Sequence, residues 1–150
     1  MAFFGVFGEG KARASVDVRS AYLCAPILHF SLDGWIALAY GKWDGDMPAT
    51  LYPHLFVATA SHSPAFSLGT SMLARLYFRF GARFYARLPY PTSFVLYDSH
   101  RATLYLGGTG GEKCYLEERD DAFLFSSEPH LLRAPIAADY LMLVKKKEAH

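Results

Sequence analysis

Two apolar runs separated by a short polar turn occur in SFVLYDSHRATLYL, residues 93–106. The runs Ser93 to Tyr97 and Ala102 to Leu106 are rich in aromatic and aliphatic side chains, which favour strands. The segment Asp98-Ser99-His100 between them is typical of a turn. Together these features predict an antiparallel hairpin.

Strands outnumber helices along the rest of the chain, and the alternation of strands and helices that marks a parallel sheet is missing. Thr70 or Ser71 is expected to cap the first helix, Gly81 to end it, and Ser127 to cap a short later helix. The sequence therefore predicts an α+β fold of antiparallel sheets with a helical layer. The other predicted strands are 3–7, 16–18, 21–30, 35–40, 51–58, 114–117 and 122–125, and the predicted helices are 70–80, 82–88, 127–132 and 137–144.

The composition suits one globular domain, with 150 residues, 52% hydrophobic and 19% charged. A net charge of +1 gives no broad electrostatic surface for nucleic acid or membrane. No apolar run reaches the roughly 18 residues of a membrane helix, and residues 1–5 do not resemble a secretory signal, so a cytoplasmic location is expected. Cys24 and Cys114 are expected to be free thiols, and no cofactor or metal is predicted.

Seven segments of the chain occur in the same order as motifs of a known family. They are MAFFGVFG at 1–8, MLARLYFRFGARF at 72–84, Leu88, SFVLYD at 93–98, LYL at 104–106, LFSSEPHLL at 124–132 and DYLML at 139–143. In this order they resemble the class II glutamine amidotransferase domain of asparagine synthetases. That family shows Met-Cys-Gly-Ile at its start, then Phe-Ala-Leu-Trp/Tyr-Asp, then Phe-Ala-Ser-Glu. The resemblance is dense over the second half of the chain and weak from Ala12 to Ser67.

The resemblance implies a four-layer αββα sandwich of the N-terminal-nucleophile (Ntn) hydrolase type. In the family, the cysteine after the initiator methionine attacks the glutamine amide, and its own α-amine acts as the base. This chain has Ala2 at that position, and a methyl group cannot form a thioester. The resemblance also implies a glutaminase-like domain over 1–134. Residues 135–150 would then be a C-terminal helix and tail, the remnant of a linker to a missing synthetase domain.

Other positions depart from the family pattern as well. The Asp that binds the glutamine α-amino group aligns with Gly69, and the Asn of the oxyanion turn aligns with Tyr40, although Gly41 is kept. The family loop Arg-Asp-x-x-Gly aligns with Gly108 to Gly111. Ala2 could be an engineered replacement or a natural loss. The joint loss of nucleophile, amine-binding Asp and oxyanion Asn favours natural loss.

Three further groups of residues have a functional and a structural interpretation. Cys24 is either a displaced nucleophile or, as we expect, a buried strand residue, and Cys114 is expected to be structural. His54 and His62 flank Ser61 and Ser63, but such closeness in sequence does not make a catalytic triad. A third group has helical spacing, which is typical of either a basic partner surface or a solvated face that Gly81 divides; it comprises Arg75, Arg79, Arg83 and Arg87.

Three functions are compatible with these observations, the third being an emptied pocket that now binds a different small ligand. The first is a non-catalytic glutaminase-like domain that acts as a scaffold or regulatory partner of an amide-forming, asparagine-synthetase-like enzyme. Peptide natural-product assembly is one pathway in which such a pair would act. The alternative is an active glutamine amidotransferase or amidohydrolase whose nucleophilic cysteine has been changed to Ala2. A protein partner, either the synthetase or a second copy of the chain, is expected for the first function.

Overall fold

Two antiparallel sheets form the protein in a computed structural model that describes residues 3–8, 27–31, 33, 35–40, 49–51, 54–61, 69–119 and 122–144. The six-stranded sheet has β1 (Phe3–Phe7) between β3 (Ile36–Tyr40) and β9 (Ala122–Ser126). Its order is β10-β8-β9-β1-β3-β2. The remaining strands of this sheet are β8 (Cys114–Arg119) and the two edge strands, β2 (Ile27–Phe30) and β10 (Ile136–Ala138).

The second sheet has five strands in the order β11-β7-β6-β5-β4. Its centre is the hairpin of β6 (Ser93–Asp98) and β7 (Thr103–Gly108), in which Asp98 pairs with Thr103 and Ser93 with Gly108. The predicted hairpin is therefore confirmed. The remaining strands of this sheet are β4 (Ala49–Leu51), β5 (Leu55–Ala60) and β11 (Tyr140–Val144).

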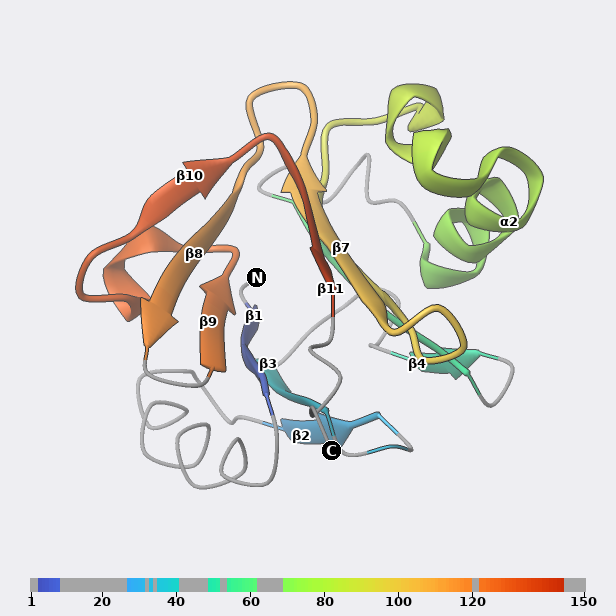
Figure 1. Cartoon of the computed structure of the whole chain (residues 1–150). Coiled ribbons are helices and arrows are strands. Elements are labelled where there is room, and N and C mark those ends of the chain that lie inside the picture. Colours follow the sequence, from blue (N-terminus) through green and yellow to red (C-terminus); the bar gives the residue numbers. More distant parts are fainter. Residues whose placement is uncertain are drawn as a thin grey trace.

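The main hydrophobic core lies between the two sheets, which face each other in Figure 1. Alternate residues of each strand point into this core, as the two-residue period of a strand requires. β1 contributes Phe3 and Phe7, β6 contributes Val95 and Tyr97, and Phe125 of β9 lies among them with no exposed surface. The sheets are thus held together by large aromatic side chains from both layers.

A helical layer covers the outer face of the five-stranded sheet (Figure 1). The helix α2 (Thr70–Phe80) buries Leu73, Ala74 and Tyr77, whose spacing puts them on one side of the helix. Gly81 ends α2 at a φ of 61°, a left-handed conformation that suits glycine, and the 3₁₀ helix η3 (Gly81–Arg87) follows. The predicted helix and its end at Gly81 are confirmed. The predicted cap is wrong, because Gly69 is the N-cap and Thr70 already lies in the first turn.

The outer face of the six-stranded sheet is also apolar and buried. Phe4 and Val6 of β1 point to this face and are 0% and 1% exposed. Leu131 and Leu132 pack on it from the short 3₁₀ helix η4 (Pro129–Leu131) and the residue that follows. The described residues therefore show two sheets, a helical layer on one side, and partial cover on the other.

The helix predicted over Ala137 to Val144 is wrong. This segment forms β10 and β11, which pair with β8 and β7 at the edges of the two sheets. Its local sequence has weak helical spacing, but pairing supplies the backbone amides with partners that a short exposed helix would not gain. Asp139 alone separates the two strands, and its carbonyl accepts a hydrogen bond from the Gly108 amide at 2.9 Å.

Other strand predictions are confirmed in part. The runs predicted at 3–7 and 35–40 form β1 and β3, and the second predicted hairpin forms β8 and β9. The run predicted over 51–58 is divided into the antiparallel pair β4 and β5. Of the run predicted at 21–30, only β2 lies within the described residues, and 16–18 lies outside them. The part of the chain that the structure describes contains no helix long and apolar enough to cross a membrane.

Candidate functional site

Two serines fix the first described residue of β1. The Phe3 amide donates a hydrogen bond to Ser127 Oγ at 2.9 Å, and the Ser127 amide donates to the Phe3 carbonyl at 3.1 Å. Ser126 Oγ donates to the same carbonyl at 2.9 Å. All three residues are buried, so β1 begins at a rigid position inside the six-stranded sheet.

These serines are positioning groups rather than nucleophiles. Ser126 Oγ donates to Phe3 and accepts a hydrogen bond from the Glu128 amide at 3.0 Å, so both of its roles serve the backbone. The helix cap predicted at Ser127 is wrong, because Glu128 is the N-cap of η4 and Ser127 forms hydrogen bonds with Phe3 instead. The motif Phe125-Ser126-Ser127-Glu128 therefore holds the start of the central strand.

The predicted pocket residues fall partly within the described chain. Ala2 and Gly41 lie outside it, as does Cys24. The backbone of Tyr40 pairs with that of Phe3, so positions 2 and 41 directly follow the last described pair of the β1–β3 ladder. Gly69 begins α2, which packs on the other sheet, and no hydrogen bond among the described residues joins it to Phe3. The structure thus brings Tyr40 to the start of β1 but does not connect Gly69 with it.

Cys114 is buried in the core between the sheets, as its structural interpretation requires. It is the first residue of β8, two strands from β1. Burial raises the pKa of the Cys114 thiol to about 12, although hydrogen bonds with the backbone of Tyr115 and Ser126 partly oppose this. The thiol therefore stays protonated near neutral pH, which removes its nucleophilic form.

The raised pKa of Cys114 predicts an alkaline loss of stability. The folded chain binds this proton more tightly than the unfolded chain, whose thiol pKa is 9.0. The free energy of unfolding is therefore expected to be level below pH 9 and to fall above it. Tyr140, whose pKa burial raises from 10.0 to about 12, adds to the fall only above pH 10. Urea unfolding across this range, compared with Cys114→Ala, tests the assignment. A fall between pH 9 and pH 10 that is equally steep in the variant would contradict it.

The four arginines with helical spacing are all exposed. Gly81 separates Arg75 and Arg79 on α2 from Arg83 and Arg87 on η3, as predicted. The change of direction at Gly81 places the Arg79 and Arg87 guanidinium groups over the ring of Phe80, at 5.4 and 4.9 Å from its centroid. No acidic residue occurs between Thr70 and Leu88, so all the charged side chains of this segment are positive.

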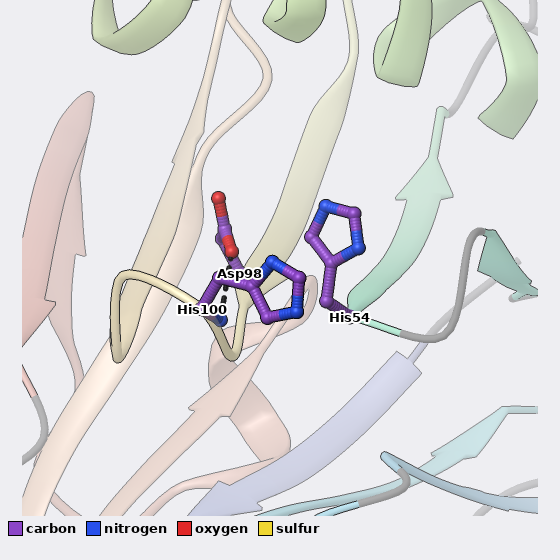
Figure 2. A group of neighbouring side chains, drawn as sticks. All are labelled: His54, Asp98 and His100. Atoms are coloured by element: carbon purple, nitrogen blue, oxygen red, sulfur yellow. Dashed lines mark hydrogen bonds between the residues drawn. The ribbon is translucent and has the colours of Figure 1, made fainter.

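The structure also contains a cluster of two histidines and an aspartate that the sequence does not predict. His54, Asp98 and His100 come together at one corner of the five-stranded sheet, and Figure 2 shows their side chains beside one another. The histidine rings are stacked, with centroids 4.0 Å apart and an interplanar angle of 4°. In the sequence, this cluster is marked only by the Asp-x-His turn at 98–100 and by a histidine just before the strand β5. Their proximity follows only once the register of β5 with β6 is known.

Comparison with solved structures identifies the fold. The chain is similar to glutamine phosphoribosylpyrophosphate (PRPP) amidotransferase from B. subtilis complexed with ADP and GMP. The TM-score is 0.59 and the identity 12%, over 87% of this chain and 42% of that one. It is also similar to the allosteric regulatory enzyme of purine biosynthesis, with a TM-score of 0.61 and 11% identity, over 95% of this chain and 46% of that one.

The chain has a glutamine amidotransferase-like fold. It spans less than half the length of these two structures, and at this identity they show the fold alone. No family model matches the chain, and no curated protein matches it. The broad resemblance expected from the sequence is therefore confirmed as a fold, and the narrower resemblance to asparagine synthetases stays a prediction.

Proposed function

We propose that this chain is a catalytically degenerate glutaminase-like domain that acts as a scaffold or regulatory partner of an amide-forming, asparagine-synthetase-like enzyme. The observation that carries the proposal is alanine at position 2, directly before the fixed strand β1 of a glutamine amidotransferase-like fold. An N-terminal nucleophile must supply a sulfur or oxygen atom from this residue. The methyl group of Ala2 supplies neither.

Two more positions support the loss of the whole glutaminase site rather than of its nucleophile alone. Gly69 takes the place of the Asp that the resemblance assigns to the glutamine α-amino group, and glycine has no side chain to bind an amine. Tyr40 takes the place of the Asn assigned to the oxyanion, and loss of one such donor lowers the rate by roughly 10²–10³-fold. A cysteine at position 2 would therefore lack both supporting groups.

The proposal includes the four-layer sandwich of the family. The helical layer on the five-stranded sheet is formed by α2 and η3. Support for a matching layer on the six-stranded sheet comes from Phe4 and Val6, which point away from the other sheet and are still buried. Such burial of apolar side chains requires cover on that face.

The partner surface in this proposal is the basic face formed by Arg75, Arg79, Arg83 and Arg87. Its four positive charges lie within a segment that has no acidic residue, while the chain as a whole has a net charge of only +1. Exposed Phe78 and Tyr85 lie on the same two helices and add aromatic contact area of the kind enriched at interfaces. An acidic surface on the amide-forming enzyme, in a cytoplasmic pathway such as peptide natural-product assembly, would fit this face.

The Ala2→Cys variant tests the proposal directly. We expect no release of ammonia from glutamine above the level of the unchanged chain, because the amine-binding and oxyanion groups are missing as well. Mass spectrometry must first show that Met1 has been removed, so that residue 2 carries the free amine. Ala2→Ser is the matched control, since it adds a hydroxyl of similar size.

Robust, glutamine-dependent ammonia release by Ala2→Cys would overturn the proposal. It would establish the alternative, an active amidotransferase in which only the nucleophile has been replaced. Release by Ala2→Cys but not by Ala2→Ser would further assign the activity to the thiol. Equal background release by all three proteins is the result that the proposal requires.

A further inference from the structure

His54, Asp98 and His100 are held together by the pairing of β5 with β6. Leu55 of β5 pairs with Asp98, the last residue of β6. His54 precedes this pair, and its carbonyl accepts a hydrogen bond from the Ser99 amide at 2.9 Å. His100 lies in the turn that leads to β7. One possible ligand atom from each of the three residues lies within 4.8 Å of the other two (Figure 2).

Asp98 presents a fixed carboxylate to this corner. Asp98 is buried, with only 4% of its surface exposed. Its Oδ1 accepts hydrogen bonds from the amides of His100 at 3.0 Å and Arg101 at 3.3 Å, the first of which is drawn in Figure 2. Its Oδ2 accepts a hydrogen bond from the Tyr77 hydroxyl at 2.6 Å. Because each carboxylate oxygen has two lone pairs, these contacts orient the group and leave it able to accept a further ligand bond.

Tyr77 reaches the carboxylate from α2, across the layer boundary. Its hydroxyl donates to Asp98 Oδ2, and Tyr77 is itself buried, so this donor is held in place behind the carboxylate. A donor of this kind behind a ligating carboxylate is the usual second contact of a metal site. Arg101 competes for the same oxygen, at 4.0 Å from Nε to Oδ2, but its side chain is 64% exposed and can turn to solvent.

The two imidazoles complete a set of two nitrogen ligands and one oxygen ligand. Their rings are parallel and 4.0 Å apart, so their in-plane lone pairs do not converge on one point as the rings now lie. A tetrahedral site with bonds of roughly 2.0–2.1 Å needs ligand atoms about 3.4 Å apart. Metal binding at this corner therefore requires His100 to rotate, and His100 is exposed and lies in a turn.

We propose that His54, Asp98 and His100 bind a divalent transition-metal ion of the zinc type, with Tyr77 as a positioning residue for the carboxylate. Two imidazoles and a carboxylate suit Zn²⁺ far better than Mg²⁺ or Ca²⁺, which prefer oxygen ligands. The ion joins α2, β5 and the β6–β7 hairpin at one point. The site lies on the α2 side of the five-stranded sheet, whereas β1 lies on the other side, so it is independent of any chemistry at Ala2.

The test uses tag-free full-length protein that has been treated with a chelator and dialysed. Zn²⁺ is titrated in competition with a chromophoric chelator, and Co²⁺ is titrated while its visible d–d absorption is recorded. We expect one Zn²⁺ per chain, a Co²⁺ spectrum of a low-coordinate site, and a rise in the melting temperature with Zn²⁺ but not with Mg²⁺.

The variants separate metal ligation from ordinary packing. His54→Ala and His100→Ala are each expected to weaken Zn²⁺ binding by more than about tenfold, and Tyr77→Phe by about tenfold. Arg101→Ala is expected to strengthen binding, because it removes the competing positive charge. His130→Ala is the matched control, since His130 is an exposed histidine on η4, and it should change nothing. Zn²⁺ affinity as high in the His54→Ala/His100→Ala double variant as in the unchanged chain would overturn the proposal.

Discussion

Replacement of Phe125 by alanine is expected to lower the free energy of unfolding by about 3–5 kcal/mol, the usual range for removal of a buried aromatic ring. Phe125 has no exposed surface and pairs with Gly5, the central residue of β1. Its ring lies directly over that glycine, because a Cβ added to Gly5 would come within 2.3 Å of the ring. Its edge also meets Phe3, with centroids 6.2 Å apart. Loss of the ring would leave a void beside the strand that carries the candidate site.

Urea unfolding followed by tryptophan fluorescence measures this loss. Phe123→Ala is the matched control, because Phe123 lies on the same strand and face but is only partly buried, and a smaller loss is expected. Gly5→Ala alone is expected to destabilise by about 1–3 kcal/mol through overpacking. Combined with Phe125→Ala it should cost less than the sum, since the added methyl enters the vacated space. A loss below about 1 kcal/mol for Phe125→Ala would show that the two sheets do not pack around this ring.

Asp98→Ala is expected to lower the free energy of unfolding by about 3 kcal/mol in metal-free protein, because a buried carboxylate with several donors is lost at once. The amides of His100 and Arg101 lose their acceptor in the β6–β7 turn, and the Tyr77 hydroxyl of α2 loses the carboxylate that accepts from it. Donors that stay buried without an acceptor add to the loss.

Asp98→Asn provides the comparison for this second variant. Its amide oxygen can still accept from the turn, so a loss of only about 1 kcal/mol is expected. Chemical unfolding in the presence of a chelator measures both variants without any contribution from a bound ion. Equal losses for Asp98→Ala and Asp98→Asn would mean that the negative charge, rather than the acceptor geometry, stabilises the corner.

Local patterns were sufficient for much of the fold. The apolar runs on either side of Asp98-Ser99-His100 predicted the central hairpin, and glycine at position 81 predicted the end of α2. Both signals depend on neighbours in the sequence, either a two-residue alternation or a residue that tolerates a positive φ. The resemblance from Gly69 to Ala134 added a glutamine amidotransferase-like fold, which the solved structures confirm at that coarse level.

Features that depend on distant pairing could not be predicted. The segment Ala137 to Val144 has weak helical spacing, and only the open edges of β8 and β7 make strands β10 and β11 of it. Ser127 resembles a helix cap, and only the approach of Phe3 gives it a different partner. His54 and His100 become neighbours through the register of β5 with β6. The position of Ala2 beside the expected pocket is still a prediction.

The passage from β10 to β11 through the single residue Asp139 limits how the two sheets can move relative to each other. The segment 136–144 forms an edge strand of each sheet. The backbone is closely packed where it passes between the sheets, because a Cβ on Gly107 would lie 2.2 Å from the Asp139 carbonyl oxygen. Sliding one sheet over the other along this side must break one of the two ladders. A partner that binds this segment would therefore restrict the motion of both sheets at once.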